Sequence, residues 1–379
     1  MTSELSSLCS YAKGKVSVDT LSKRNYVSTE NMMPNKGGIV DAGALPSAQY
    51  TQQYIKDDIL VSNIRPYFKK IWMADDDGGC SNDVLVFRAD RGCDSTFLYY
   101  ILANDAFFNY ASATSKGTKM PRGDKTAIMQ YKVPCFNYET QLRIGKLLRS
   151  IDDRIAVNKK INDNLQQQLF SLYENMATAS PCSKEYTLSN LCDFQEGYVN
   201  PPQTHPEYFD GEVKWLRAVD INESFIIETS RTLTKAGFES AKKSALLFEP
   251  NTIAISKSGT IGRLGIIADY MCGNRAVINI APHDTNMLAF IYCFLKSKQR
   301  EFPDMAVGSV QKNLYVSLLE PLSVSIPDNE SLTAFNAVGA SILGMIHNNC
   351  VENTDLANLR DTILPKLMSG ELDVSSVLI

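Results

Sequence analysis

The chain has 379 residues, of which 44% are hydrophobic and 21% are charged. This composition is typical of folded proteins, and the length is enough for two globular domains with connecting elements. No run of about 18 apolar residues occurs, and the first residues carry no basic patch followed by an apolar core, so neither a membrane span nor a secretion signal is expected. The net charge of −4 is a mild argument against nucleic-acid binding, which nevertheless needs only one basic face.

Cysteine and histidine content restricts metal and catalytic chemistry. The nine cysteines include no pair spaced as C-x-x-C, which favours reduced thiols in a cytoplasmic protein over a zinc site or a disulfide framework. The three histidines, His205, His283 and His347, lie far apart in the sequence. We therefore expect neither a metal site nor a histidine-based catalytic centre.

Residues 1–137 predict a first globular domain. Short alternating apolar segments separated by turns indicate strands, for example at residues 58–62, and a helix is expected at about residues 97–109. Because strands and helices are mixed within one stretch, the predicted class is α+β with a sheet.

Residues 138–179 change to the pattern of one long helix. Apolar residues recur at alternating spacings of three and four, which is coiled-coil periodicity, and no proline or glycine interrupts residues 146–179. At about 1.5 Å per residue, this uninterrupted segment reaches about 50 Å. The stripe consists of Ile144, Leu148, Ile151, Ile155, Asn158, either Ile161 or Asn162, Leu165, Leu169 and Leu172.

Residues 180–331 repeat the first domain. Matching segments occur in the same order about 190 residues apart, which indicates a duplicated unit. The matched pairs are residues 5–9 with 188–192, 58–62 with 252–256, 80–82 with 272–274, and 133–134 with 326–327. A second domain of the same α+β fold is therefore predicted, with a helix at about residues 288–298.

Residues 332–379 complete the repeat with a second long helix. Its stripe consists of Ile342, Ile346, Asn349, Asn353, Leu356, Leu359 and Ile363. An apolar stripe on one side of a helix must be buried, and the matching stripe in this chain is the other copy, so the two helices are expected to pack antiparallel. The predicted seam joins Ile151, Ile155, Asn158 and Leu165 to Ile346, Asn353, Leu356 and Ile363.

Two asparagines occupy the same point of the two helical stripes. Aligning Ile151 with Ile346 places Asn158 on Asn353. A polar Asn within an apolar seam costs stability and fixes the register of the helices. The alternative is that either Asn lies on the helix flank, exposed to water.

The two helical segments resemble the conserved regions of the specificity (S) subunits of type I restriction-modification systems. The residues that carry this resemblance are 147–155 (LLRSIDDRI), 158–162 (NKKIN) and 359–372 (LRDTILPKLMSGEL). The resemblance implies two target-recognition domains separated by two antiparallel helices, with each domain reading half of a split sequence in double-stranded DNA. A helical spacer of about 50 Å corresponds to roughly one and a half turns of B-DNA.

The same resemblance implies that this chain is a non-catalytic subunit. Its expected partners are two methyltransferase (M) subunits and restriction (R) subunits. S-adenosylmethionine, ATP and Mg²⁺ are expected on those partners, with no cofactor in this chain.

DNA contact is expected from loops of the two domains. Arg, Lys, Asn and Gln side chains match base edges and phosphates, although surface loops are commonly polar and basic without binding DNA. In the first domain the candidates are Asn63, Arg65, Lys69, Lys70, Lys116, Lys119 and Arg122. In the second they are Lys257, Ser258, Arg263, Asn274, Arg275, Gln311 and Lys312. Because the loops differ between the two copies, the two half-sites should differ, giving an asymmetric target.

Two further functions remain as alternatives. The first is a degenerate single-chain DNA methyltransferase, since residues 200–203 (Asn-Pro-Pro-Gln) are similar to the Asn-Pro-Pro-aromatic motif of amino-DNA methyltransferases. Gln203 cannot stack a flipped base, no glycine-rich cofactor turn accompanies the motif, and we interpret residues 200–202 as a turn. The second is a coiled-coil scaffold that joins two protein-binding domains.

Overall fold

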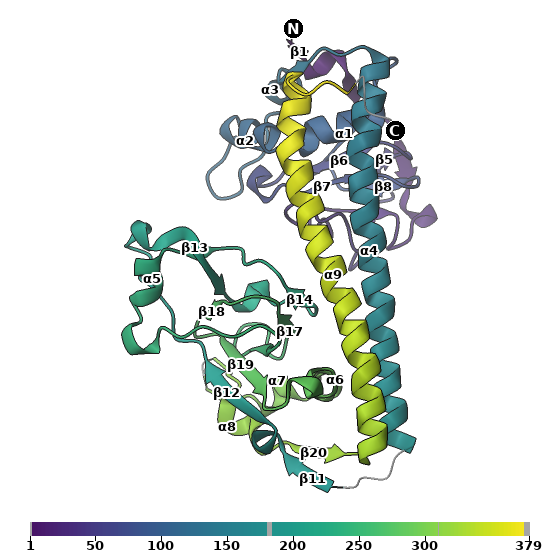
Figure 1. Cartoon of the computed structure of the whole chain (residues 1–379). Coiled ribbons are helices and arrows are strands. Elements are labelled where there is room, and N and C mark those ends of the chain that lie inside the picture. The colour runs from purple at the N-terminus through teal and green to yellow at the C-terminus, as the bar shows by residue number, and fades with distance from the viewer. Residues whose placement is uncertain (1, 180–183, 310, 375–379) are drawn as a thin grey trace. The chain divides into compact units, whose positions relative to one another are not determined.

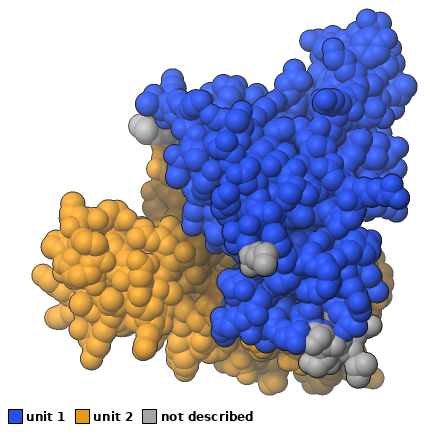
Figure 2. All heavy atoms as spheres, turned by 90° about the horizontal axis from the view of Figure 1, so that it is seen from above, with its two compact units in different colours: residues 1–154, 356–379 blue, residues 155–355 orange. Residues whose placement is uncertain are grey.

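The computed structural model describes residues 2–179, 184–309 and 311–374 (Figure 1). The chain forms two compact units, one made of residues 1–154 and 356–379 and the other of residues 155–355 (Figure 2). Both unit boundaries fall inside long helices, α4 (Tyr138–Ala179) and α9 (Asn329–Ser369). Each unit therefore combines one globular domain with a part of each long helix.

The first domain is built on a four-stranded antiparallel sheet of order β2-β9-β6-β7. Its strands are Cys9–Tyr11, Val84–Ala89, Ile59–Ser62 and Ile71–Met73. Successive side chains of a strand point to opposite faces. In the central strand β6, Ile59 and Val61 accordingly pack into one core and Leu60 into another.

A second four-stranded sheet of order β3-β5-β8-β4 completes this domain. Its strands are Lys15–Ser17, Tyr50–Tyr54, Gly78–Cys80 and Tyr26–Val27, of which β4 and β8 run parallel. A separate antiparallel pair joins β1 (Thr2–Glu4) to β10 (Lys132–Pro134).

The helix expected at residues 97–109 is in fact two helices. They are α1 (Ser95–Ala103) and α2 (Asp105–Ala113), followed by the short α3 (Lys125–Met129). The break lies at Asn104, whose backbone is extended and whose side-chain oxygen accepts a hydrogen bond from the Ala106 amide. Asn is a strong helix N-cap, and this local hydrogen bond starts a new helix where the apolar pattern continues.

The second domain has a five-stranded sheet of order β12-β19-β16-β17-β14. Its strands are Cys192–Glu196, Val277–Pro282, Ile253–Ser256, Leu264–Ile267 and Phe225–Ile226. A three-stranded sheet of order β15-β13-β18 contains Thr232–Leu233, Phe209–Leu216 and Cys272–Gly273. Helix α6 (Leu288–Lys298) confirms the prediction at 288–298, and three short helices, α5 (Lys235–Glu239), α7 (Phe302–Met305) and α8 (Val316–Leu319), complete the domain.

The structure confirms the repeated α+β architecture predicted from the sequence. The antiparallel pair β1–β10 has its counterpart in β11 (Lys184–Thr187) with β20 (Ser323–Ile326), and a single 3-10 turn follows β1 and β11 alike. The central strands β6 and β16, matched in the sequence, are fully buried in both domains. In β16, Ile253 and Ile255 face one core and Ala254 the other, as in β6.

The long helices run antiparallel within each unit. In the second unit Asn158 Nδ2 donates to Asn353 Oδ1 at 3.1 Å, and Asn349 Nδ2 donates to Asn162 Oδ1 at 2.8 Å. Ascending residue numbers on α4 thus meet descending numbers on α9. Asn158 is fully buried, so it does not lie on a solvent-exposed flank.

The structure decides one alternative in the predicted stripes and corrects two of their residues. Asn162 is buried and Ile161 is 41% exposed, which decides between these two seam candidates. Leu172 and Leu359 are exposed as well, so neither belongs to a buried stripe. Their neighbours Tyr173, which is buried, and Arg360, which is half-buried, turn inward instead.

In the described parts of the chain no helix combines the length and hydrophobicity needed to cross a membrane.

Candidate nucleic-acid interface

The first-domain candidates lie on two loops that the backbone joins. The Arg65 amide donates to the Pro121 carbonyl at 2.8 Å, and the Gly123 amide donates to the Asn63 carbonyl at 3.1 Å. Gly123 is buried, and a Cβ there would lie 2.8 Å from Asn63 Oδ1, so any larger residue would have to displace the Asn63 side chain. Residues 63–70 and 116–123 therefore form one surface at the end of β6.

The second domain builds the same scaffold at the end of β16. The Leu314 amide donates to the Lys257 carbonyl at 2.9 Å, in the place of the Gly123–Asn63 bond. Val307 and Asn313 are joined by paired amide–carbonyl bonds of 3.0 and 2.9 Å, as Lys116 and Arg122 are at 2.8 and 2.9 Å. The Lys257 amide also donates to the Ala276 carbonyl at 2.7 Å, which brings residues 274–275 beside the same loop.

Several candidate cations form ion pairs with carboxylates of the first domain. Lys69 Nζ lies 2.8 Å from Asp105, Lys116 Nζ 2.5 Å from Asp124, and Arg122 Nε 3.1 Å from Asp83. Burial raises the pKa of Asp105, but hydrogen bonds from Lys69 and Lys36 outweigh it and lower that pKa overall.

Lys70 and Lys257 are held more tightly still. Lys70 Nζ donates to the Thr29 carbonyl at 2.6 Å, and burial lowers the pKa of this lysine. Lys257 Nζ pairs with Glu196 at 2.8 Å and lies 4.8 Å from the centre of the Tyr315 ring, with 13% of its side chain exposed. These two lysines are placed to shape the loops rather than to present a free charge.

Four of the remaining candidates are exposed and available to a ligand. Within the described residues no side-chain partner is seen for Lys119, Arg275, Gln311 or Lys312, all of which are exposed. Ser258 and Arg263 are half-buried. Asn274 uses its side-chain oxygen to accept from the Ala276 amide, and its Nδ2 group has no partner in the part of the chain that the structure describes. Asn63 and Arg65 each keep one enclosed polar atom, Oδ1 and Nε respectively, without a hydrogen-bond partner.

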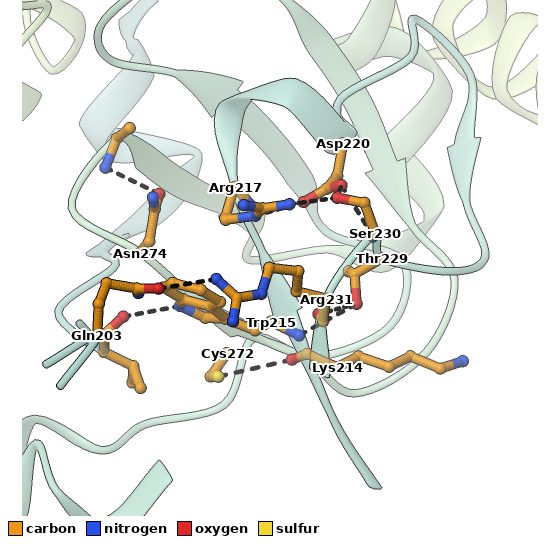
Figure 3. Close-up of polar contacts among 12 residues, drawn as sticks. Gln203, Lys214, Trp215, Arg217, Asp220, Thr229, Ser230, Arg231, Cys272 and Asn274 are labelled. Atoms are coloured by element: carbon orange, nitrogen blue, oxygen red, sulfur yellow. Dashed lines mark hydrogen bonds and ion pairs between the residues drawn. The ribbon is translucent and has the colours of Figure 1, made fainter. Parts of the chain in front are cut away.

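A second polar group in the second domain was not predicted from the sequence. Arg217 follows β13, and Figure 3 shows Asp220 and Ser230 beside its guanidinium. Arg231 Nη1 donates to Gln203 Oε1 at 2.9 Å, and the Arg231 guanidinium lies 4.2 Å from the Phe209 ring centre. The signal that could have revealed this group is the pair of Arg217 and Asp220, three residues apart and directly after the alternating segment that forms β13.

The described residues contain no cluster of metal-ligating side chains. No three Asp, Glu, His or Cys side chains come together there as a metal site would require. The segment at residues 200–203 leads into a turn closed by the His205 amide and the Pro202 carbonyl at 3.1 Å, and Gln203 pairs with Arg231.

Comparisons with known proteins agree on one family. The chain is 24% identical over 308 residues to the specificity subunit of the type I restriction enzyme MjaIX from Methanocaldococcus jannaschii, covering 76% of this chain and 71% of that protein. It is 26% identical to the specificity subunit of the type I restriction enzyme HindI from Haemophilus influenzae, covering 92% of this chain and 94% of that protein. A crystal structure of the S subunit of a type I restriction-modification system from M. genitalium has a similar fold, with a TM-score of 0.56, 18% identity and coverage of 97% and 96%.

The family model of the type I restriction modification DNA specificity domain matches the chain twice, over residues 1–167 and 183–354. Each match spans one globular domain and much of the helix that follows it. These relatives favour neither the scaffold nor the degenerate methyltransferase. The duplicated match shows that this chain belongs to the family of type I restriction-modification DNA specificity domains.

Proposed function

We propose that this chain reads a bipartite, asymmetric DNA sequence and directs partner methyltransferase and restriction subunits to it, without catalysing a reaction itself. The observation that carries the proposal is the loop scaffold built twice, at the ends of β6 and β16, with different side chains. A shared framework with different polar groups suits two half-sites that differ in sequence. Because the substrate is the cell's DNA, we place the protein in the cytoplasm.

The outer faces of the long helices support a role in subunit docking. Val157, Ile161 and Leu172 of α4 are 47%, 41% and 41% exposed, and their spacings of four and eleven residues place them on one face. Val338 and Met345 of α9, seven residues apart, are each 48% exposed. Exposed apolar stripes of this kind are typical of protein–protein contacts, and we assign them to two methyltransferase subunits. S-adenosylmethionine, ATP and Mg²⁺ would then be bound by the partners.

A domain exchange tests the proposal. Residues 1–137 are replaced by the equivalent domain of a related specificity subunit, and methylated sites are mapped in a host that also carries the methyltransferase partner. One half of the methylated sequence should change while the other half stays the same, and exchange of residues 180–331 should do the reverse. A swap that alters both halves together, or a methylation pattern independent of this chain, would contradict the proposal.

The lack of catalysis is tested separately with the purified chain. Without partners it should neither methylate nor cleave DNA, and addition of the methyltransferase subunits should restore sequence-specific methylation. Robust turnover by the chain alone would show that the catalytic assignment is wrong.

A further inference from the structure

The two domains share a turn that follows equivalent strands, β4 in the first and β13 in the second. The Val27 carbonyl accepts from the Ser81 amide at 2.8 Å, and the Leu216 carbonyl accepts from the Asn274 amide at 2.9 Å. Both strands pair in parallel with their neighbours, β8 and β18. The residue after each of these carbonyls therefore occupies the same place in the two folds.

The turn itself is closed in the same way in both copies. The Ser28 amide donates to Asn31 Oδ1 at 2.6 Å, and the Arg217 amide donates to Asp220 Oδ2 at 2.9 Å. In each case the side chain of the residue three positions later accepts a hydrogen bond from the amide of the first residue of the turn. The backbone geometry is thus conserved within this chain, while the pair Ser28 and Asn31 in one domain is replaced by Arg217 and Asp220 in the other.

The Arg217 guanidinium is held in one orientation. Its Nη2 group donates to Ser230 Oγ at 2.5 Å, its Nε lies 3.6 Å from Asp220 Oδ2, and its plane lies over the Trp215 ring at 5.5 Å (Figure 3). Asp220 is nearly inaccessible, with 3% of its side chain exposed, and also accepts from Ser230. Nε is enclosed and has no hydrogen-bond partner, and Nη1 has none among the described residues either; 25% of the side chain is exposed, so the edge formed by Nη1 and Nη2 is available to a ligand.

We propose that Arg217 is a specificity-determining residue that reads a guanine in the half-site of the second domain, with Asp220 and Ser230 as positioning residues. This rests on the proposed function. A planar guanidinium edge presents two parallel donors that match the O6 and N7 acceptors of guanine in the major groove. A guanidinium held in one orientation is better suited to a base edge than to a phosphate. A phosphate accepts hydrogen bonds from many directions, so a flexible lysine can bind it without a fixed geometry. Ser28 lacks such an edge, so the first domain reads a different base at the equivalent place.

The test uses the full chain in complex with its methyltransferase partner and maps methylation on a randomised DNA library. The informative variant is the double change Arg217→Ser with Asp220→Asn, because the first domain shows that this pair supports the same turn. Selectivity for guanine at one position of the second half-site should fall by about 10- to 100-fold, with the other positions and the first half-site unchanged. The conservative Arg217→Lys should lose most of this selectivity as well, because lysine has no planar edge. Arg231→Ala, which removes a neighbouring arginine already bound to Gln203, is the matched control and should leave the preference for guanine intact.

The outcomes distinguish a failure of base reading by Arg217 from a failure of the proposed function. An even loss of methylation at all sequences, with a weaker salt dependence, would identify Arg217 as a phosphate contact and overturn the inference. An unchanged site preference would overturn it too. In both cases the unaltered first half-site would leave the proposed function standing. A wild-type complex whose methylation pattern does not depend on this chain would remove the proposed function itself.

Discussion

Asp152 shows how single side chains connect the first domain to both long helices within its unit. Its carboxylate accepts from the Tyr100 hydroxyl of α1 at 2.6 Å and from Arg360 Nη1 of α9 at 2.6 Å. Asp152 and Arg360 belong to the segments 147–155 and 359–372 that carried the family resemblance. Burial is the largest cause of the raised pKa of Tyr100, with Asp152 adding to it, so this tyrosine stays a neutral donor.

Removal of this carboxylate should destabilise the protein. Asp152→Ala would leave the Tyr100 hydroxyl without its acceptor and the half-buried Arg360 with only Asp361, so we expect a loss of about 1–3 kcal/mol of unfolding free energy. Asp153→Ala is the control, because Asp153 and its partner Arg149 are both more than half exposed, and we expect a change within about 0.5 kcal/mol. Denaturant unfolding of the purified chain measures both, and equal effects would show that the Asp152 contacts contribute nothing specific.

The candidate residues also show what a sequence can reveal about a site. Loops 63–70 and 116–123 were selected by residue type, and the structure brings them together, as it does Lys257 with residues 274–275. Which cations are already paired could not be predicted, because Asp105 lies 36 residues from Lys69 along the chain. The Arg217 group was missed for the same reason, since Ser230 reaches it only through the fold.

At the scale of elements, hydrophobic periodicity predicted the long helices well and their inward faces less well. Spacings of three and four cannot separate Ile161 from Asn162, because adjacent positions differ by only 100° around a helix. Which of the two residues is buried depends on the facing helix. Asn349 Nδ2 donates to Asn162 Oδ1, and this hydrogen bond compensates for the cost of burying the Asn162 amide. The split between α1 and α2 likewise depended on one capping residue, Asn104, with apolar residues on both sides of it.

A matched set of isoleucines tests the helix packing. Ile151 and Ile346 are 7% and 1% exposed, so Ile151→Asp or Ile346→Asp would bury a charge and should each lower the unfolding free energy by at least about 3 kcal/mol. Ile161→Asp makes the same chemical change at a 41% exposed position and should be nearly silent in a thermal melt. If all three variants melted alike, the assigned faces of α4 and α9 would be wrong.

The Ile161 variant has a second use, because this side chain belongs to the exposed stripe of α4. The folded Ile161→Asp chain should capture less methyltransferase subunit, since a charge in an apolar interface must be desolvated on binding. Size-exclusion chromatography of the mixed subunits measures the complex, and Lys160→Gln at the neighbouring exposed position, which also changes the charge by −1, is the control for charge alone. Undiminished capture by Ile161→Asp would exclude this stripe from the docking surface.

At the scale of the whole molecule, α4 and α9 are continuous across the boundary between the two units, so their length should set the spacing of the half-sites. Inserting seven residues into both helices, after Arg154 and after Asp355, keeps the contacts of Asp152 with Arg360 and of Asn158 with Asn353. It adds about 10 Å, or about three base pairs, at about 1.5 Å per residue. Three base pairs are roughly a third of a turn of DNA, whereas a seven-residue insertion rotates a helix face by only about 20°. The longer gap would therefore be read out of phase, and methylation should fall.

An insertion of 21 residues in both helices should restore activity. It adds about 32 Å, close to the 34–36 Å of one DNA turn, and rotates the helix face by about 60°, so the longer gap would be read closer to its original phase than with seven added residues. Methylation mapping should then show both original half-sites with a gap longer by about nine or ten base pairs. If the seven-residue variant were as active as the 21-residue variant, helical phase would not limit recognition. If the 21-residue variant kept the original gap, the helices would not set the spacing at all.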